Sequence, residues 1–236
     1  MKPYEDKFVI FADILGWREL VKQSEEDESI LKQLQRVTKL LTEIDRFTPD
    51  AVDAINTVSS QKSNAAIELG KADVGTIQFS DSLVFVFSHS MVSFIYAYAV
   101  LSAITSILAN VGFFIRGGID YGSIHYEDRA IFGPALNRAY YIESECAKVP
   151  RILFSDRAQQ ALSTMALPAE FLFLDEEQLC LNTFRHLENV DKIKTIVQDK
   201  IRLYGGEPNY LVKYHWLEKR LEHLSSSSIE SDGPPL

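Results

Sequence analysis

Cysteine is scarce in this sequence, with only Cys146 and Cys180 among 236 residues. Two thiols cannot build a disulfide framework or a four-thiolate zinc site, so we expect a reducing, cytoplasmic setting. Basic residues are also in deficit, since 24 Lys and Arg face 33 Asp and Glu, for a net charge of −9. An acidic chain without a long basic run is a poor candidate for binding a nucleic acid backbone.

The sequence also lacks an unbroken apolar run long enough to cross a membrane. Residues 82–115 contain no Asp, Glu, Lys or Arg, and a span needs about 20 apolar residues. However, serine, threonine, histidine and asparagine interrupt this stretch, and its first part alternates like a strand. We therefore expect a strand followed by a core helix, with no stable membrane insertion. The N-terminal residues MKPYEDKFVIFADILGW do not resemble a signal peptide.

What the sequence does contain is an ordinary globular composition. Hydrophobic residues make up 46% and charged residues 24%, which suits one substantial domain. We expect this domain to cover residues 1–224. The tail SSSSIESDGPPL, residues 225–236, has a composition typical of disorder.

Hydrophobic periodicity predicts strands, hairpins and helices in mixed order. Strands are expected at 8–12, 151–155 and within 170–184, hairpins at 75–87 and 113–128, and helices at 18–23, 28–47, 91–110, 134–148, 157–165, 190–203 and 210–224, with a loop-rich insertion at 48–73. This order predicts an α+β fold of the ferredoxin-like kind, with a mostly antiparallel sheet and helices packed on one face.

The segment FVIFADILGW, residues 8–17, places Asp13 at the end of a buried strand and before a glycine turn. A carboxylate in that position can hold a divalent cation. The backbone amides of Leu15, Gly16 and Trp17, at the start of the following helix, can receive phosphate oxygens. The alternative is that Asp13 merely caps the helix.

Asp81 lies in the turn of the hairpin QFSDSLVF, residues 78–85. A turn aspartate commonly bonds nearby backbone amides, which is the alternative interpretation here. Together with Asp13, however, it forms a pair of carboxylates at the ends of adjacent strands. Such a pair suits two hard cations roughly 3.5–4 Å apart that clamp a phosphoryl group.

The segment IFGPALNRAYYIE, residues 131–143, opens a helix at Pro134. Asn137 and Tyr141 are four residues apart and share a face, whereas Arg138 points about 100° away. Asn137 could orient a sugar or a phosphate, or it could be an exposed polar residue of an amphipathic helix. The five histidines show no metal-ligand spacing, and the sequence contains no P-loop.

Four segments together resemble the class III nucleotide cyclases: FADILGW, FSDSLVFVF, FIRGGIDYGSI and IFGPALNRA, in this order over about residues 7–156. The resemblance implies a homodimer with active sites at the subunit interface and two divalent cations, Mn²⁺ or Mg²⁺, per site. Asp13 and Asp81 would be the metal carboxylates, with the Ile14 carbonyl as a further ligand. Asn137 of the partner subunit would orient the ribose of a nucleoside triphosphate.

The chain departs from the purine cyclases of that family at three positions. Four residues before Asp81, where a lysine reads the purine, it has Ile77. Seven residues before Asn137, at the second purine reader, it has Ala130. Four residues after Asn137 it has Tyr141 in place of a transition-state arginine, for which Arg138, Arg129 or Arg116 would have to substitute.

Without purine readers, and with the bulky Phe79 able to narrow the base pocket, the chain resembles the pyrimidine cyclases of bacterial Pycsar antiphage defence. That resemblance implies conversion of UTP, or less readily CTP, to cyclic UMP or cyclic CMP, which would activate a partner effector. Two alternatives stay open. One is an adenylate or guanylate cyclase with relocated base readers, and the other is a catalytically silent module that binds a nucleotide.

Overall fold

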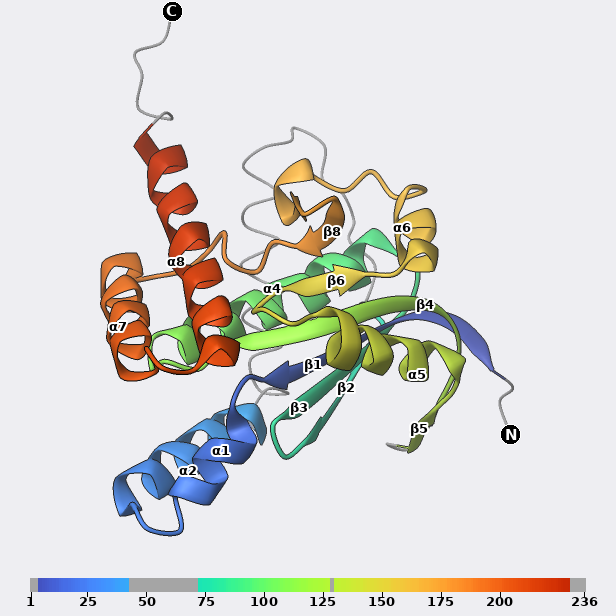
Figure 1. The fold of residues 1–236 in the computed structure, drawn as a ribbon. Helices are drawn as coiled ribbons and strands as arrows, with labels where there is room; N and C mark the ends of the chain where they lie inside the picture. Colours follow the sequence, from blue (N-terminus) through green and yellow to red (C-terminus); the bar gives the residue numbers. More distant parts are fainter. Residues whose placement is uncertain (1–3, 43–71, 128–129, 230–236) are drawn as a thin grey trace, which may run out of the picture.

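The computed structural model describes residues 4–42, 72–127 and 130–229. One sheet runs through the molecule in the order β2-β3-β1-β4-β6-β8-β7, and β5 pairs with β4 (Figure 1). All neighbouring strands are antiparallel except β4 and β6. The strands are β1 (Glu5–Ile14), β2 (Val74–Phe79), β3 (Ser82–Phe87), β4 (Ile115–Glu127), β5 (Ala130–Phe132), β6 (Ile152–Phe154), β7 (Leu172–Asp175) and β8 (Gln178–Leu181). The predicted α+β class is confirmed.

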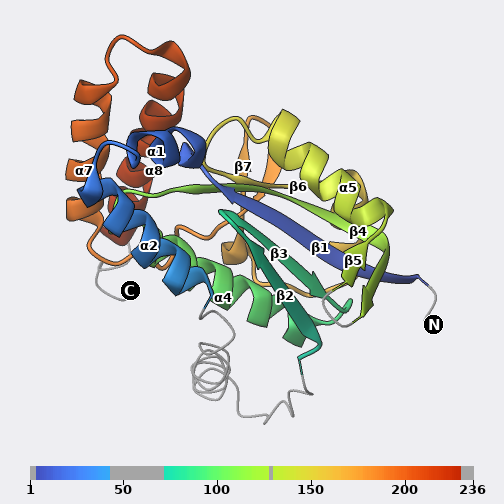
Figure 2. The same ribbon diagram turned by 90° about the horizontal axis from the view of Figure 1, so that it is seen from below.

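Helices cover both faces of the sheet, not one face as the sequence predicted. Helix α5 (Pro134–Tyr141) lies on one face and α4 (Met91–Ala109) on the other (Figure 2). The reason is that successive side chains of β1 point to opposite faces of the sheet and are buried on both. Phe8 belongs to the large core cluster under α4, whereas its neighbour Val9 belongs to the cluster under α5.

Helix α4 is the predicted core helix. It is apolar all round, and by length and composition alone it could cross a membrane. In the fold, however, most of its side chains are buried against the sheet and the helices around it. Ser90 caps its N-terminus, because the Ser90 hydroxyl accepts a hydrogen bond from the Ser93 amide.

The predicted hairpin at 113–128 is wrong: this segment forms the single long strand β4. Its glycines suggest a turn, but they instead allow other backbone to come close. A Cβ at Gly118 would collide with the Ala139 carbonyl oxygen and lie 2.7 Å from Cβ of Ile142, and one at Gly117 would lie 2.7 Å from the Phe11 carbonyl oxygen. The smallest residue is therefore required where α5 and β1 press against β4.

Several element ends also differ from prediction. The helix that begins at Pro134 does not stay α-helical to 148, because residues Ile142–Cys146 form a π-helical turn, η2. Helix α8 (Pro208–Ile229) continues past the predicted end at 224 into the predicted disordered tail.

The insertion at 48–73 and the end of the helix predicted to reach 47 lie mostly outside the described residues, as does the rest of the tail. The remaining helices are α1 (Trp17–Gln23), α2 (Glu28–Thr42), α6 (Asp156–Leu162) and α7 (Val190–Leu203).

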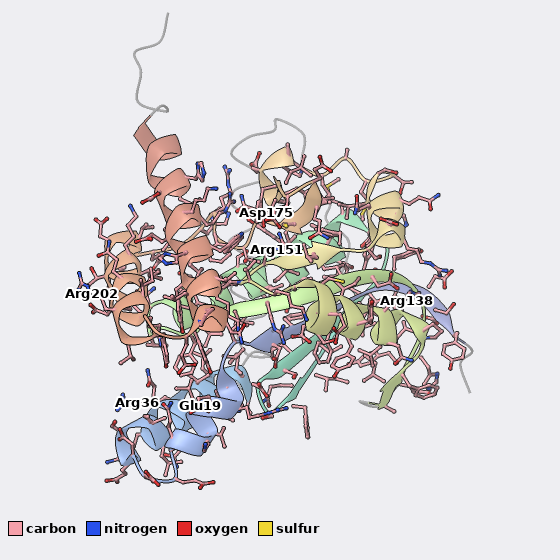
Figure 3. The ribbon with its side chains drawn as sticks, in the orientation of Figure 1. Glu19, Arg36, Arg138, Arg151, Asp175 and Arg202 are labelled. Carbon is pink, nitrogen blue, oxygen red and sulfur yellow. The ribbon has the colours of Figure 1, made fainter. Side chains whose placement is uncertain are left out.

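Helices α7 and α8 form an antiparallel pair at one end of the sheet (Figure 1). Their shared apolar core includes Phe114, the residue before β4, and Leu217 of α8, with Leu15 packed against it. A polar contact also holds α8 in place, since Trp216 Nε1 donates to Asp175 at 2.9 Å. Asp175 is in turn paired with Arg151 (Figure 3). The loop after β1 is therefore enclosed by the C-terminal helices.

Candidate active site

Asp13 is the last residue but one of β1, at the edge where the sheet meets α1. Its partners in register are Ser82 of β3 and Arg116 of β4. Because side chains alternate along a strand, Asp13 shares a face with Val9 and Phe11, the face that α5 covers. The Ser82 hydroxyl donates a hydrogen bond of 3.2 Å to Asp13 Oδ1.

Asp81 lies beside Asp13. It occupies the two-residue turn between β2 and β3, in which Ser80 adopts a left-handed backbone with φ of 55°. The turn returns the chain so that β3 runs next to β1, and the Asp81 carboxyl comes within hydrogen-bonding reach of the Asp13 carboxyl. The structure thus brings together the two acidic residues that the sequence suggested as a pair.

The Asp13 carboxyl resists ionisation. Its pKa is raised from 3.8 to about 7, first by burial, then by the charge of Asp81 and its hydrogen bond, and also by the charge of Glu143. Arg116 acts in the opposite direction. Burial and neighbouring carboxylates thus disfavour the ionised form of Asp13, which a bound cation would favour.

An arginine and a glutamate complete this cluster. Arg116 Nη2 lies 2.7 Å from Glu143 Oε1, and Arg116 Nη1 donates to the Ala147 carbonyl oxygen at 3.2 Å. Glu143 is 2% exposed, and burial raises its pKa although Arg116 lowers it. The contact is an ion pair without good hydrogen-bond alignment, since Glu143 Oε1 and Arg116 Nε have no hydrogen-bond partner among the described residues. Sequence reasoning missed Glu143, which reaches the site through the π-helical turn.

The two carboxylates fit a cation site in which the substrate supplies some of the metal ligands. No group of three or more His, Cys, Asp and Glu in the described ranges could hold a metal ion. Mg²⁺, however, is commonly bound by one or two carboxylates, with waters and substrate phosphates supplying the other ligands. Asp13, Asp81 and the Ile14 carbonyl would be such a partial set, and their role as ligands stays a prediction.

Asn137 and Tyr141 project away from the sheet. Ala135 and Ala139, on the opposite side of α5, are fully buried against β1 and β4, whereas Asn137 is exposed and Tyr141 is 61% exposed. Both side chains are therefore free to meet a molecule outside their own subunit. Their predicted roles with the ribose and the transition state stay predictions.

Arg138, predicted as a substitute for the missing arginine, is engaged elsewhere. Its Nε donates to Asp120 Oδ2 at 2.7 Å, and Ser155 Oγ donates to Asp120 Oδ1 at 2.6 Å. Asp120 is completely buried. Arg138 also lies far across the molecule from Glu19 of α1, the helix that follows Asp13 (Figure 3). Arg116, in contrast, is close enough to Asp13 for its charge to act on that carboxyl, and Arg129 lies outside the described residues.

The loop after Asp13 only partly fits its predicted role with phosphate. The Leu15 amide donates to the Phe114 carbonyl oxygen at 2.9 Å, so the fold already uses this group and the prediction for it needs correction. Gly16 has a φ of 81° and begins α1, which explains the glycine there. The Trp17 side chain is buried beside Phe113. The amides of Gly16 and Trp17 stay the predicted phosphate donors.

The two residues at the base-reader positions, Ile77 and Ala130, lie in different places, and Phe79 lies with Ile77. Ile77 and Phe79 pair with Val84 and Ser82, which puts them on the Asp13 face of the sheet, and Phe79 is 80% exposed. Ala130 pairs with Glu127, at the other end of β4 from Arg116. Eleven residues of strand between 116 and 127 correspond to roughly 35 Å. Ala130 therefore cannot contact a base held at the acidic pair of its own chain.

Comparisons with known proteins found similarity in structure only. No family model matches the sequence, and no curated protein matches it. The monomeric guanylyl cyclase domain of the RhoGC fusion protein from the aquatic fungus Blastocladiella emersonii is similar, with 18% identity and a TM-score of 0.49, over 76% of this chain and 95% of that one. The catalytic core of a rhodopsin-guanylyl cyclase with converted specificity, in complex with ATPαS, has 18% identity and a TM-score of 0.47, over 76% and 93%. At such low identity these likenesses do not specify a substrate.

Proposed function

We propose that the protein is a nucleotide cyclase. In this reaction the 3′-hydroxyl of a nucleoside triphosphate loses its proton and attacks the nucleotide's own α-phosphorus. The bond from that phosphorus to the bridging oxygen breaks, and pyrophosphate leaves. The observation that carries the proposal is the pair Asp13 and Asp81, one near the end of β1 and the other in the turn before β3, with their carboxyl groups within hydrogen-bonding reach.

Asp13, Asp81 and the Ile14 carbonyl would hold two Mg²⁺ or Mn²⁺ ions. When bound, these cations lower the pKa of the attacking hydroxyl and offset charge on the leaving group. Arg116 is the protein's own positive charge at this place, and its ion pair with buried Glu143 fixes it there. It therefore supplies part of the charge stabilisation that Tyr141, a neutral group, cannot give.

The substrate we propose is a pyrimidine nucleotide, UTP before CTP. Ile77 and Ala130 offer no polar side chain to read a purine edge, and the exposed ring of Phe79 stands near the acidic pair. A missing recognition hydrogen bond weakens discrimination by a few kcal/mol. In this proposal the product is a second messenger for a bacterial antiphage effector, and the enzyme works in the cytoplasm.

A homodimer is part of the proposal because a single chain leaves the site incomplete. Asn137 faces outward, and Ala130 lies at the far end of β4 from the acidic pair of its own chain. Several aromatic side chains are also left in solvent around this face, which is typical of an interaction surface. They are Phe79, Tyr140 and Tyr141.

The test is incubation of the purified protein with Mn²⁺ and each of the four nucleoside triphosphates, with the products separated by chromatography. We expect cyclic UMP or cyclic CMP together with pyrophosphate. Asp13→Asn and Asp81→Asn should each lose at least about 100-fold in kcat, as for loss of a group that stabilises the transition state. Asp156→Asn, an exposed carboxylate on α6, is the control and should stay active. Cyclic AMP or cyclic GMP as the sole product would refute the pyrimidine assignment, and no cyclic product at all would refute the cyclase.

A second candidate function is a catalytically silent module that binds a nucleotide. It is favoured by one observation: Tyr141 stands where the family has an arginine, while Arg138 is bound to Asp120. Such a module would bind a triphosphate in the presence of Mn²⁺ without releasing pyrophosphate. Binding measured by calorimetry beside the turnover assay separates the two functions.

A further inference from the structure

A narrow cavity opens where the C-terminal helices meet the loop after Asp13. Its wall includes Leu15 and Gly16 of that loop, Lys200 of α7 and Lys213 of α8. The cavity measures about 30 Å³, which is room for about one water-sized group. It can therefore take the end of a chain-like ligand but not a nucleobase.

Two lysines in this wall lie over aromatic rings and, among the described residues, are not paired with a carboxylate. In the described part of the chain, neither Lys200 nor Lys213 forms an ion pair with an acidic side chain. Their ammonium groups instead lie over tyrosine rings, Lys200 Nζ 5.8 Å from the ring centre of Tyr214 and Lys213 Nζ 5.3 Å from that of Tyr210. Burial lowers the pKa of both lysines. Half-buried cations without a counter-ion are stabilised by an anion.

The tyrosine rings under these lysines are held in place by stacking on one another. Tyr204 stacks on Tyr210 with ring centres 4.8 Å apart, and on Tyr214 at 5.9 Å. Glu19 of α1 also lines the cavity, but its side chain accepts a hydrogen bond from Gln23 Nε2 at 3.2 Å. The wall is thus a mixed one, with two cations and one carboxylate.

The cavity lies next to the acidic pair, because Leu15 and Gly16 in its wall directly follow Asp13 and Ile14 in the chain. Lys213 is close enough to Arg116 for the two charges to repel, and Arg116 in turn attracts Asp13. An anion that begins at Asp13 and extends past Arg116 would meet Lys213 next. A triphosphate is such an anion, because its charge grows toward the terminal phosphate.

We propose that Lys213 and Lys200 form a subsite for the terminal phosphates of the nucleotide, so that the helices α7 and α8 are part of the active site. This proposal rests on the proposed function, since it assigns the far end of the same substrate. Lys213 is nearer to Arg116, so it should contribute more than Lys200 to binding of the terminal phosphates.

The experiment uses inorganic tripolyphosphate as the probe and needs no turnover. Binding to the full chain is measured by calorimetry in EDTA at low ionic strength. We expect Lys213→Gln to weaken binding about tenfold and Lys200→Gln to weaken it less, as for a lost charge-assisted hydrogen bond. Lys213→Arg keeps the charge and should keep most of the affinity. Lys219→Gln is the matched control, because Lys219 is exposed and lines a groove on another side of α8.

The outcomes separate this proposal from the cyclase proposal. Equal affinity in the parent, Lys213→Gln and Lys219→Gln proteins would overturn the subsite, as would no binding to the parent. If Lys213→Gln fails to fold, Lys213→Met, which keeps the length of the side chain and removes its charge, gives the same comparison. In the turnover assay Lys213→Gln should raise KM for the triphosphate about tenfold. Tripolyphosphate binding that depends on Lys213 in a protein without cyclase activity would support the subsite and refute the proposed reaction.

Discussion

At the scale of single residues, the carboxyl of Asp13 links the fold to its chemistry. Its folded-state pKa of about 7 exceeds the ordinary 3.8, so between these values the folded chain holds a proton that the unfolded chain has released. Stability without metal therefore falls as pH rises from about 4 to about 7, and the loss is complete above the folded pKa. A bound cation would remove this loss by favouring the ionised form.

This gives a prediction for Asp13→Asn, which cannot ionise. At pH 8 and in EDTA the variant should melt about 2–4 °C above the parent, the shift that about 1 kcal/mol produces in a domain of this size. The difference should shrink as the pH is lowered and vanish below about pH 4. Mn²⁺ should raise the melting temperature of the parent more at pH 8 than at pH 6, and that of the variant little. A difference in melting temperature between the variant and the parent that stays the same from pH 5 to pH 8 would contradict the raised pKa.

A second prediction concerns the ion pair of Arg116 and Glu143. Arg116→Gln leaves the buried Glu143 carboxyl without its cation, so we expect a loss of about 3 kcal/mol in the free energy of unfolding. Glu143→Gln in addition should recover most of that stability without restoring turnover, because the charge at the site is still absent. The measurements are urea denaturation and kcat, made on Arg116→Gln and on the double variant Arg116→Gln/Glu143→Gln. Turnover restored along with stability would mean that Arg116 has only a structural role.

Sequence reasoning reached some of these residues and missed others for a physical reason. Asp13 lies near the end of β1, and Asp81 lies in the turn just before β3, the strand that pairs with β1. Their proximity can therefore be read from hydrophobic patterning and turn chemistry. Glu143 could not be found in that way, because the spacing of an α-helix places it elsewhere than the π-helical turn does. Lys213 was missed because no local pattern links α8 to β1.

At the scale of elements, β4 shows where patterning misleads. Gly117, Gly118 and Gly122 resemble turn residues, whereas in the fold they make space for neighbouring backbone and for the Arg138 side chain. The hairpin β2–β3 and the helix α7 were predicted well, because a tight polar turn and a one-sided apolar stripe are local signals.

Gly118 provides a prediction at this scale. Gly118→Ala forces α5 and η2 away from β4, since the new methyl group would collide with the Ala139 carbonyl oxygen and Ile142. We expect a loss of about 1–3 kcal/mol of stability, as for overpacking, and a lower kcat because η2 carries Glu143. Gly206→Ala is the control, since a Cβ there meets nothing within 4 Å. Equal stability of the two variants in chemical denaturation would contradict this account.

At the scale of the whole molecule, the proposal requires two chains to complete one site. Asp81→Ala and Asn137→Ala proteins should each be inactive alone. Mixed and allowed to exchange subunits, they should regain about a quarter of the parent activity, because half of the dimers are mixed and each has one intact site. Mass spectrometry confirms that mixed dimers form. No recovery in their presence would mean that the site lies within one chain.

The central claim is that Asp13 and Asp81 jointly hold divalent cations around a triphosphate. Its most direct test is anomalous scattering from crystals soaked with Mn²⁺ and a non-hydrolysable UTP analogue. The account predicts Mn²⁺ peaks between the two carboxylates, with the terminal phosphates directed toward Lys213. The two carboxylates pointing apart with no peak between them, while the analogue is bound, would contradict it.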